Sequence, residues 1–237
     1  MHDAIRVLNE DFRMLNADLS TVVAAFTNLT GDAEMEFELA KLDPNGNCTN
    51  GIDRIVTPKT YKAGDGANGS NASKINMWPR DKYLNIYTVN NIASGAAGYT
   101  YLPGSVSASI DGIIILYNYV GSIAPSSVNT SRALGHEIGH WFNLPHVWGG
   151  TNQPGVACGD DGVSDTPVTK GWTTCNLTSN DVCNPGTEEN VQNYMDYAYC
   201  YRMFTKGQCS RMRTSAQSTI AQRNNLWTTS NLSLIHI

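Results

Sequence analysis

The spacing of apolar residues near the start of the chain predicts a helix. Four apolar residues recur there at intervals of three or four positions: Ile5, Leu8, Phe12 and Leu15. Because an α-helix has 3.6 residues per turn, this spacing places them on one face. We therefore expect an amphipathic helix over residues 3–16, whose role is core packing.

Strands are expected in the segments that follow. Residues 34–39 alternate strictly between glutamate and an apolar residue, which is typical of a half-buried strand with a solvated acidic face. A second strand is expected at residues 52–56, and two more at residues 83–89 and 113–116. A polar segment with three glycines, residues 63–73, interrupts this series, and we interpret it as a surface loop.

A second helix is predicted around residues 136–146, which read H-E-I-G-H-W-F-N-L-P-H. Leu134, Ile138 and Trp141 form an apolar stripe at positions i, i+4 and i+7 of this helix. Such a stripe would bury the helix against a sheet and leave its histidines facing a cleft.

The histidines of this stretch have the spacing of a metal site. His136 and His140 lie four residues apart, so a helix places both imidazoles on one face. Asn143 tolerates a positive φ and Pro145 prevents helix continuation, so the chain can turn and bring His146 to the same point. Three histidines and a water form the open site of zinc catalysis, in which the metal lowers the pKa of the water toward about 7.

Glu137 follows the first histidine and lies about 100° around the helix from it, off the row of ligands. From there its carboxylate can accept a proton from the metal-bound water, so we predict that Glu137 is the general base. The alternative is that these are ordinary helix histidines. Three of the chain's five histidines stand at the offsets that the motif requires, which favours the metal site.

The extended motif, together with Asn-Tyr-Met-Asp-Tyr at residues 193–197, resembles the metzincin metalloendopeptidases and, within them, the small microbial members of the pappalysin family. The resemblance runs from the first helix to about Trp227. It implies that Met195 lies beneath the metal without binding it, with plain core packing as the alternative. It also implies that the hydroxyl of Tyr197 stabilises the oxyanion, with a buried structural tyrosine as the alternative.

The resemblance also suggests where a substrate binds. In metzincins an edge strand on the rim of the cleft pairs with the extended substrate, and residues 99–102 are the candidate for that strand. Ordinary sheet membership is the alternative. Relatives that cleave beside basic residues use an acidic residue soon after the methionine turn, but residues 195–200 offer no clear counterpart, so cleavage preference is left open.

An acidic, glycine-containing segment at residues 159–167 is a candidate calcium loop. It holds three carboxylates in nine residues, and hard oxygen ligands on a flexible turn suit calcium. It also resembles a calcium-bearing loop of the family. The expected ligands are Asp161, the carbonyl of Val163, Asp165 and Thr166. A solvated acidic turn is the alternative.

Six cysteines in a chain rich in Asn, Ser, Thr and Gly favour an oxidising compartment, although the count alone would also suit metal binding. The resemblance implies two bridges: Cys158 with Cys183, and Cys175 with Cys200. Cys48 and Cys209 are left over, and they either pair with each other or leave Cys48 free.

The end of the chain predicts one more helix. Thr205 and Gln208 have the spacing of a capping box, so a helix is expected to begin there and run toward Asn224. Residues 232–237 resemble translated adapter sequence, so we interpret them as a non-native tail and exclude His236 from the site.

Overall charge and hydropathy exclude some classes of partner. A net charge of −5 gives no basic face for nucleic acid or an anionic membrane. No run approaches the about 20 apolar residues of a membrane span, and the N-terminus lacks the apolar core of a signal peptide. We expect a secreted monomer, a mature or truncated piece of its protein, with protein or peptide substrates.

These observations predict an α+β metzincin-like fold in one catalytic domain, residues 1–231. A twisted mixed sheet and helices would form an upper part, residues 1–146, and disulfide-stapled irregular loops with a C-terminal helix a lower part, residues 147–231. The expected function is zinc-dependent hydrolysis of peptide bonds, with calcium as a second metal. Two alternatives stay open: a catalytically silent, metal-stabilised binding domain, and a latent form in which the thiolate of Cys48 occupies the fourth metal position.

Overall fold

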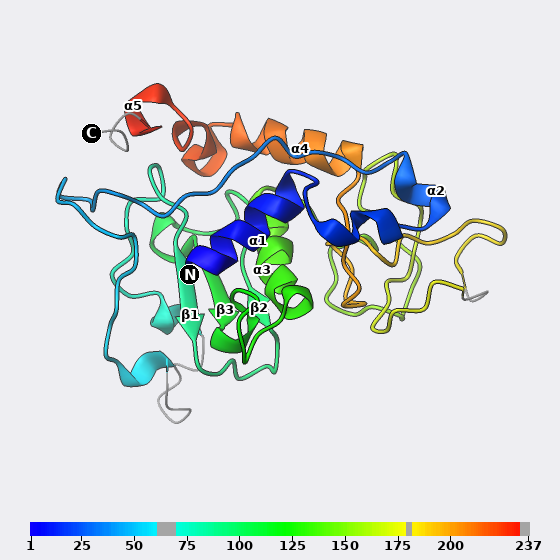
Figure 1. Ribbon diagram of the computed structural model, residues 1–237, viewed down its shortest axis with the longest axis horizontal. Coiled ribbons are helices and arrows are strands. Elements are labelled where there is room, and N and C mark those ends of the chain that lie inside the picture. Colours follow the sequence, from blue (N-terminus) through cyan, green and yellow to red (C-terminus); the bar gives the residue numbers. More distant parts are fainter. Residues whose placement is uncertain (61–69, 179–181, 233–237) are drawn as a thin grey trace.

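The computed structural model describes residues 1–60, 70–178 and 182–232. Most of the loop expected at residues 63–73 lies outside this range, as do residues 233–237 of the expected non-native tail. Figure 1 shows an elongated molecule, with a small sheet and helices toward one end and long loops toward the other. The α+β class is confirmed.

The central helix, α3 (Val128–Trp141), carries His136 and His140 as expected, but it begins upstream of the expected range around 136–146 and ends before the expected turn at Asn143. Ser127 and Thr130 form a capping box at its first turn. Its apolar stripe is buried, with Leu134 2% exposed and Ile138 and Trp141 fully covered. This stripe anchors the helix in the main hydrophobic core.

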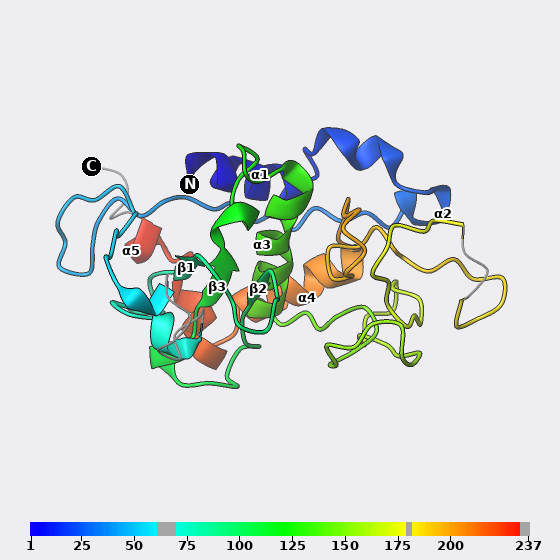
Figure 2. The ribbon, with the colours of Figure 1, turned by 90° about the horizontal axis from the view of Figure 1, so that it is seen from below.

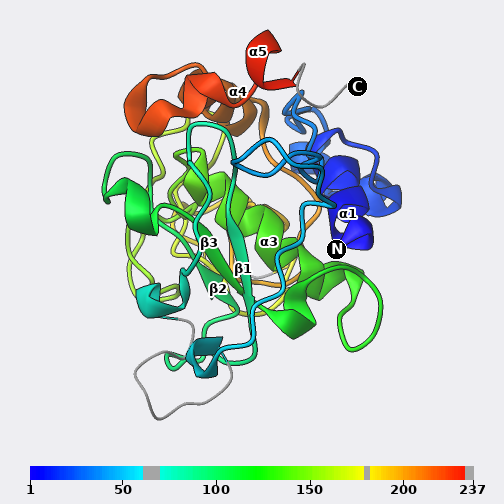
Figure 3. The ribbon, with the colours of Figure 1, turned by 90° about the vertical axis from the view of Figure 1, so that its left-hand side faces the viewer.

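The sheet has three strands: β1 (Ile86–Val89), β2 (Gly98–Tyr99) and β3 (Ile113–Leu116). β3 lies in the middle, parallel to β1 and antiparallel to β2. Seen from the side, α3 runs beside the sheet, and α3 also contacts β2 (Figure 3). The strand expected at 113–116 is confirmed. The strand expected at 83–89 is shorter, and the candidate substrate strand at 99–102 is reduced to Gly98–Tyr99.

The strands expected at residues 34–39 and 52–56 are wrong, because neither segment belongs to a strand. In residues 34–39, a side chain makes the main-chain hydrogen bonds that a neighbouring strand would otherwise make. Asn9 donates from Nδ2 to the Phe37 carbonyl at 3.0 Å, and its Oδ1 accepts from the Phe37 amide at 2.7 Å. The Phe37 ring packs edge-on against Phe12 at 4.9 Å between centroids. The alternating pattern therefore reflects an extended segment that packs on a helix.

The first helix, α1 (His2–Phe12), is shorter than the expected range of 3–16. Met14 has a φ of 55°, a left-handed conformation that ends the helix, and Leu15 beyond it is 71% exposed. Leu15 matched the periodicity but does not join the core. A short helix, α2 (Ala24–Thr27), follows along the chain.

The last long helix, α4 (Lys206–Ala216), has the predicted capping box of Thr205 and Gln208. It ends well before the expected Asn224, and a 3-10 segment, Ile220–Asn225, follows. Two residues in that segment, Ala221 and Gln222, have φ values of 53° and 62°, which no α-helix accommodates. A short helix, α5 (Thr229–Leu232), comes last.

This interruption allows Arg223 to reach the core. Its guanidinium donates to both carboxylate oxygens of Asp111, at 2.8 and 3.0 Å, and stacks on the Trp141 ring at 3.3 Å from the centroid. Other short 3-10 segments complete the described elements: Ala17–Thr21, Pro58–Thr60, Asn71–Ser73, Ala108–Ile110 and Tyr117–Tyr119. None of the helices in the described ranges is long and apolar enough to cross a membrane.

Between α3 and α4 the chain forms long loops, which project beyond the sheet in Figures 1 and 2. Residues 147–204, named the cysteine-rich region below, contain no helix or strand where the structure describes them. Two disulfides crosslink this region, Cys158–Cys183 and Cys175–Cys200, the pairing that the resemblance implied. Cys48 is free and exposed and Cys209 is free and buried, so these two do not pair.

Candidate metal centre and active site

Three histidines converge at the end of α3. His136 and His140 extend from one face of the helix, and His146 returns to them after the turn. One ligand atom from each of the three lies within 4.8 Å of the others, and no other group of this kind occurs among the described residues. The Nε2 atoms of His140 and His146 are 3.1 Å apart.

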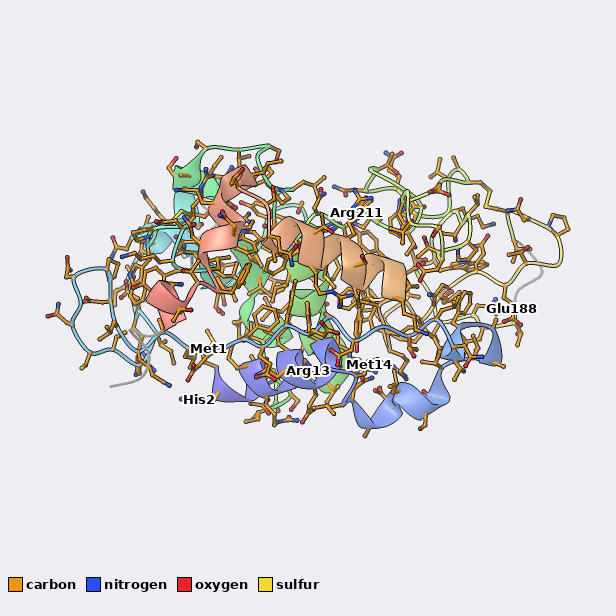
Figure 4. The ribbon with its side chains drawn as sticks, turned by 90° about the horizontal axis from the view of Figure 1, so that it is seen from above. Met1, His2, Arg13, Met14, Glu188 and Arg211 are labelled. Carbon is orange, nitrogen blue, oxygen red and sulfur yellow. A yellow bond between two sulfur atoms is a disulfide. The ribbon has the colours of Figure 1, made fainter. Side chains whose placement is uncertain are left out.

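The turn between the second and third histidines has the predicted form. Asn143 has a φ of 76°, and the Leu144 amide donates back to the Gly139 carbonyl at 2.9 Å. Arg211 of α4 donates to the Asn143 carbonyl at 2.7 Å, which ties the turn to the last helix. Figure 4 shows Arg211 on α4, at the side of the helix that faces the loops.

Main-chain carbonyl oxygens orient all three imidazoles. Each Nδ1 faces one of them: Tyr194 for His136 at 2.7 Å, Leu144 for His140 at 2.6 Å, and Thr151 for His146 at 2.8 Å. A carbonyl oxygen only accepts hydrogen bonds, so each Nδ1 carries the proton and each Nε2 presents a lone pair. This is the arrangement that metal-ligating histidines have in proteins.

The surroundings keep these imidazoles neutral. Burial lowers the pKa of His140 to about 4 and that of His146 to about 3, and burial moves the pKa of His136 well below its ordinary value. His136 Nε2 is buried and has no hydrogen-bond partner. Converging lone pairs repel one another unless a cation lies between them. The donor set therefore fits a zinc ion bound by three histidines.

Glu137 lies beside this cluster, close to the edge strand. It is only 7% exposed, and burial raises its pKa to about 8, an effect that the charge of Lys74 opposes. A Cβ atom on Gly98 of β2 would lie 3.1 Å from Glu137 Cγ. The absence of a side chain at Gly98 thus leaves the space that the Glu137 side chain occupies.

The methionine and tyrosine predicted near the metal lie at the cluster. Met195 is fully buried, and a Cβ on Gly139 of α3 would collide with its sulfur. The Tyr197 ring centroid is 5.4 Å from that of His136 and 4.8 Å from that of His146. Both residues therefore lie near the histidine cluster, and their roles stay predictions.

The candidate calcium loop has partners of its own. Asp161 Oδ1 accepts from the Val163 amide at 3.0 Å and from the Thr166 hydroxyl at 2.5 Å. The Asp165 carboxylate points to the start of α4, where it accepts from the Thr205 hydroxyl at 2.7 Å and the Gly207 amide at 2.8 Å. Thr166 also donates to the Val163 carbonyl at 2.7 Å, so three of the four expected ligands lie together, and the Asp165 carboxylate is engaged at the start of α4.

Sequence reasoning missed several contributors to the site. Trp148 stacks on the ring of His146, and Gly98 makes room for Glu137. The sequence did offer a signal for Trp148, because it is an aromatic residue two positions after the third histidine, His146. The carbonyl partners of the histidines depend on tertiary packing and leave no side-chain signal. Cys48 is not part of the cluster that the described residues form.

Comparisons with known proteins agree with this geometry. The model of peptidase family M43, described as "Pregnancy-associated plasma protein-A", matches residues 68–217. This chain belongs to that family of metallopeptidases, so the predicted resemblance to pappalysins is confirmed.

Relatives and solved structures extend the match. An extracellular metalloprotease of Neurospora crassa is 38% identical over 140 residues, which are 55% of this chain and 47% of the relative. One from Arthroderma otae is 33% identical over 141 residues, or 57% of this chain and 51% of the relative. The chain thus spans about half the length of the curated relatives it matches. Mature mirolysin of Tannerella forsythia, solved in complex with a cleaved peptide, is 33% identical with a TM-score of 0.83, covering 97% of this chain and 88% of that chain.

Proposed function

We propose that this protein is a secreted zinc-dependent endopeptidase that hydrolyses peptide bonds in proteins and acts as a monomer through one catalytic domain. The observation that carries the proposal is the convergence of three neutral imidazoles beside the buried carboxyl group of Glu137. Membership of a metallopeptidase family supports it. Relatives named extracellular metalloproteases and two disulfides support secretion.

His136, His140 and His146 would hold the zinc ion through Nε2. Bound there, zinc supplies a Lewis acid for the scissile carbonyl and lowers the pKa of water. The main-chain carbonyls that accept from the three histidines keep the rings oriented and in one tautomer, so the site is preorganised.

Glu137 moves the proton. Its carboxylate accepts a proton from the attacking water and then gives that proton to the leaving amine, so one residue acts as base and then as acid. The hydroxyl of Tyr197 donates a hydrogen bond to the oxyanion of the tetrahedral intermediate. Met195 supports the site from below through packing alone.

An extended peptide substrate would pair with the free edge of β2. Gly98 and Tyr99 pair on one side with β3. The other side of this short strand can donate and accept main-chain hydrogen bonds with a substrate strand. The complex of mature mirolysin with a cleaved peptide supports a peptide as the ligand of this site. Pairing at β2 would bring the scissile bond next to Glu137, which adjoins Gly98.

Calcium is a second proposed ligand, for Asp161, Val163, Asp165 and Thr166. Asp161 is buried, and a hard cation would compensate its charge. Because Asp165 also bonds to the start of α4, such an ion would link the loop to that helix. Calcium should raise the thermal midpoint of the parent protein and not that of Asp161→Asn. Equal midpoints of the parent with calcium and with a calcium chelator would contradict this proposal.

The main test is hydrolysis of an unbiased peptide library by the parent protein and by Glu137→Gln, with zinc measured in both. Glutamine keeps the size of the side chain but accepts no proton. We expect one zinc per chain in both proteins and a loss of about 10²–10⁴-fold in rate for the variant, the usual contribution of a general base. A parent that holds zinc and cleaves nothing, or a variant as active as the parent, would contradict the proposal.

A further inference from the structure

Trp148 is in contact with both His146 and Tyr197. Its ring stacks on the His146 imidazole, with centroids 4.5 Å apart and planes at 3°. The Tyr197 ring meets Trp148 edge-on, with centroids 5.1 Å apart and planes at 79°. Trp148 is 4% exposed, so water does not compete at these contacts. One side chain thus supports a proposed metal ligand and the proposed oxyanion donor.

A shared acceptor adds a second link between Trp148 and His146. The indole N–H of Trp148 donates to the Thr151 carbonyl at 3.0 Å, and His146 Nδ1 donates to the same oxygen at 2.8 Å. A carbonyl oxygen has two lone pairs and accommodates both donors. By holding this carbonyl, Trp148 fixes the acceptor that sets the tautomer and the ring orientation of His146.

Another part of the cysteine-rich region packs against the Trp148 ring. Gly171 lies directly against the indole, because a Cβ atom there would collide with the ring. The Gly171 amide donates to the Thr169 hydroxyl at 3.1 Å, and that hydroxyl donates to Glu189 at 2.5 Å. Glu189 also accepts from the Cys183 amide at 2.7 Å, next to a disulfide. The indole is therefore in contact with both His146 and a crosslinked loop.

We infer that Trp148 is a positioning residue, which orients His146 for the metal and limits the movement of Tyr197. This inference rests on the proposed zinc peptidase function. It also gives the irregular cysteine-rich region a task, because the Gly171 segment holds the indole in place. Trp148 does not touch the substrate or the metal in this role and acts through the two residues that do.

The test compares Trp148→Leu and Trp148→Phe with the parent. The zinc dissociation constant is measured by competition with a chelator in the absence of peptide. We expect leucine to raise this constant about 10- to 100-fold, the usual effect of losing a partner of a metal ligand. Phenylalanine keeps a stacking ring and loses the N–H donor, so an increase of about three- to tenfold is expected. In both variants saturated with zinc, kcat should fall more than KM rises, because Tyr197 acts in the transition state.

The matched control is Trp227→Leu. Trp227 is also a tryptophan whose N–H donates to a carbonyl, that of Ala216 at 2.8 Å, but it is 52% exposed and outside the site. The zinc dissociation constant of Trp227→Leu should stay within about twofold of that of the parent. This control separates the loss of a tryptophan from the loss of a contact with His146.

Thermal melting distinguishes positioning from plain stability. At a given zinc concentration, zinc raises the melting midpoint more when the folded protein binds it more tightly, because the stabilisation grows with the logarithm of the zinc concentration over the dissociation constant. A positioning role predicts a smaller zinc-induced rise in the Trp148 variants than in the parent. Equal rises in the parent and in the variants, with zinc constants within twofold of each other, would overturn the inference. If leucine prevents folding, the phenylalanine variant decides by the same criteria. A parent that binds zinc and cleaves no peptide refutes the proposed function and leaves this zinc-binding test valid.

Discussion

The two ends of the molecule reach stability by different means. Around α1, α3 and the sheet, helices and strands supply main-chain hydrogen bonds, and a core of buried apolar residues such as Ile113, Leu134 and Ile138 holds them together. In the cysteine-rich region, residues 147–204, the described chain has no helix or strand. Two disulfides crosslink it instead, each joining residues 25 positions apart.

Buried carboxylates replace secondary structure in that region. Asp196 Oδ1 accepts from the main-chain amides of Trp172 at 3.0 Å and Tyr197 at 2.6 Å. Glu189 and Asp161 accept from the amides of other loop residues in the same way. Loops that form no β-sheet hydrogen bonds thus satisfy their buried main-chain N–H groups with side-chain acceptors. The comparison teaches that the cysteine-rich region shares the main core through residues such as Trp148 and Met195, and adds crosslinks and buried carboxylates where it has no helix or strand.

The largest effect is expected at a buried charge of the helical region. Arg132 of α3 is 1% exposed and donates to Asp11 of α1 at 3.0 Å. Arg132→Met would leave Asp11 buried without its partner, so unfolding should become easier by about 3–5 kcal/mol. Chemical denaturation measures this loss. The exposed Arg6→Met is the control, with an expected loss below about 1 kcal/mol. A loss for Arg132→Met as small as the control's would contradict the account of this region.

The disulfides are expected to matter in the cysteine-rich region. Replacing Cys175 and Cys200 together by serine removes a crosslink that closes a loop of 25 residues. The chain-entropy relation predicts a loss of about 3.5 kcal/mol. Denaturation of the oxidised parent and of the double variant measures it. Cys48→Ser is the control, because Cys48 is free and exposed. The comparison fails if the double variant and the control are equally stable.

A pH-dependent effect is expected at Asp196. Burial raises its pKa from 3.8 to about 7 in the folded protein. The folded state therefore binds the proton more tightly than the unfolded state, and the parent loses stability as pH rises from about 4 through 7. Asp196→Asn carries no such charge. In metal-free protein, its stability relative to the parent should increase by about 2 kcal/mol between pH 5 and pH 8.

Denaturation curves at several pH values test this slope, with the exposed Asp53→Asn as control. A difference between Asp196→Asn and the parent that stays constant with pH, or that falls as pH rises, would show that Asp196 is not held in its protonated form by burial.

The smallest effects are expected at the helix caps, where the two regions can be compared directly. Thr205 caps α4 at the end of the cysteine-rich region, and Ser127 caps α3. Each change to alanine should cost about 1 kcal/mol. Thr205→Ala should cost more than Ser127→Ala, because Thr205 also donates to Asp165 at 2.7 Å. Thermal melts of both variants measure the order, and the reverse order would indicate that the hydrogen bond from Thr205 to Asp165 does not stabilise α4.

Local patterns with strict geometry could be predicted from the sequence. The helix that carries His136 and His140, the left-handed turn at Asn143 and the capping box at Thr205 all depend on residues close together in the chain. The interactions that form them involve only a few residues that are close together in the sequence. The disulfide pairing came from resemblance, because spacing alone allows many connectivities.

Features that depend on distant residues could not be predicted. Residues 34–39 alternate like a strand, but the side chain of Asn9 occupies their main-chain groups. The last helix was predicted too long. The chain leaves the helical conformation before Arg223, which bonds to Asp111 in the core, and local spacing does not reveal this distant partner. The contact of Trp148 with His146 likewise needs the turn to be folded before the two rings meet.

The most direct test of the central claim is the X-ray absorption spectrum at the zinc edge of the protein loaded with one equivalent of zinc. We predict three imidazole nitrogens and one oxygen from solvent, the open coordination of a catalytic site. His146→Ala should remove one nitrogen from the spectrum. A sulfur ligand from Cys48 or Cys209, or any other fourth ligand from the protein, would contradict the claim. It would show that the enzyme is latent or that the zinc is structural.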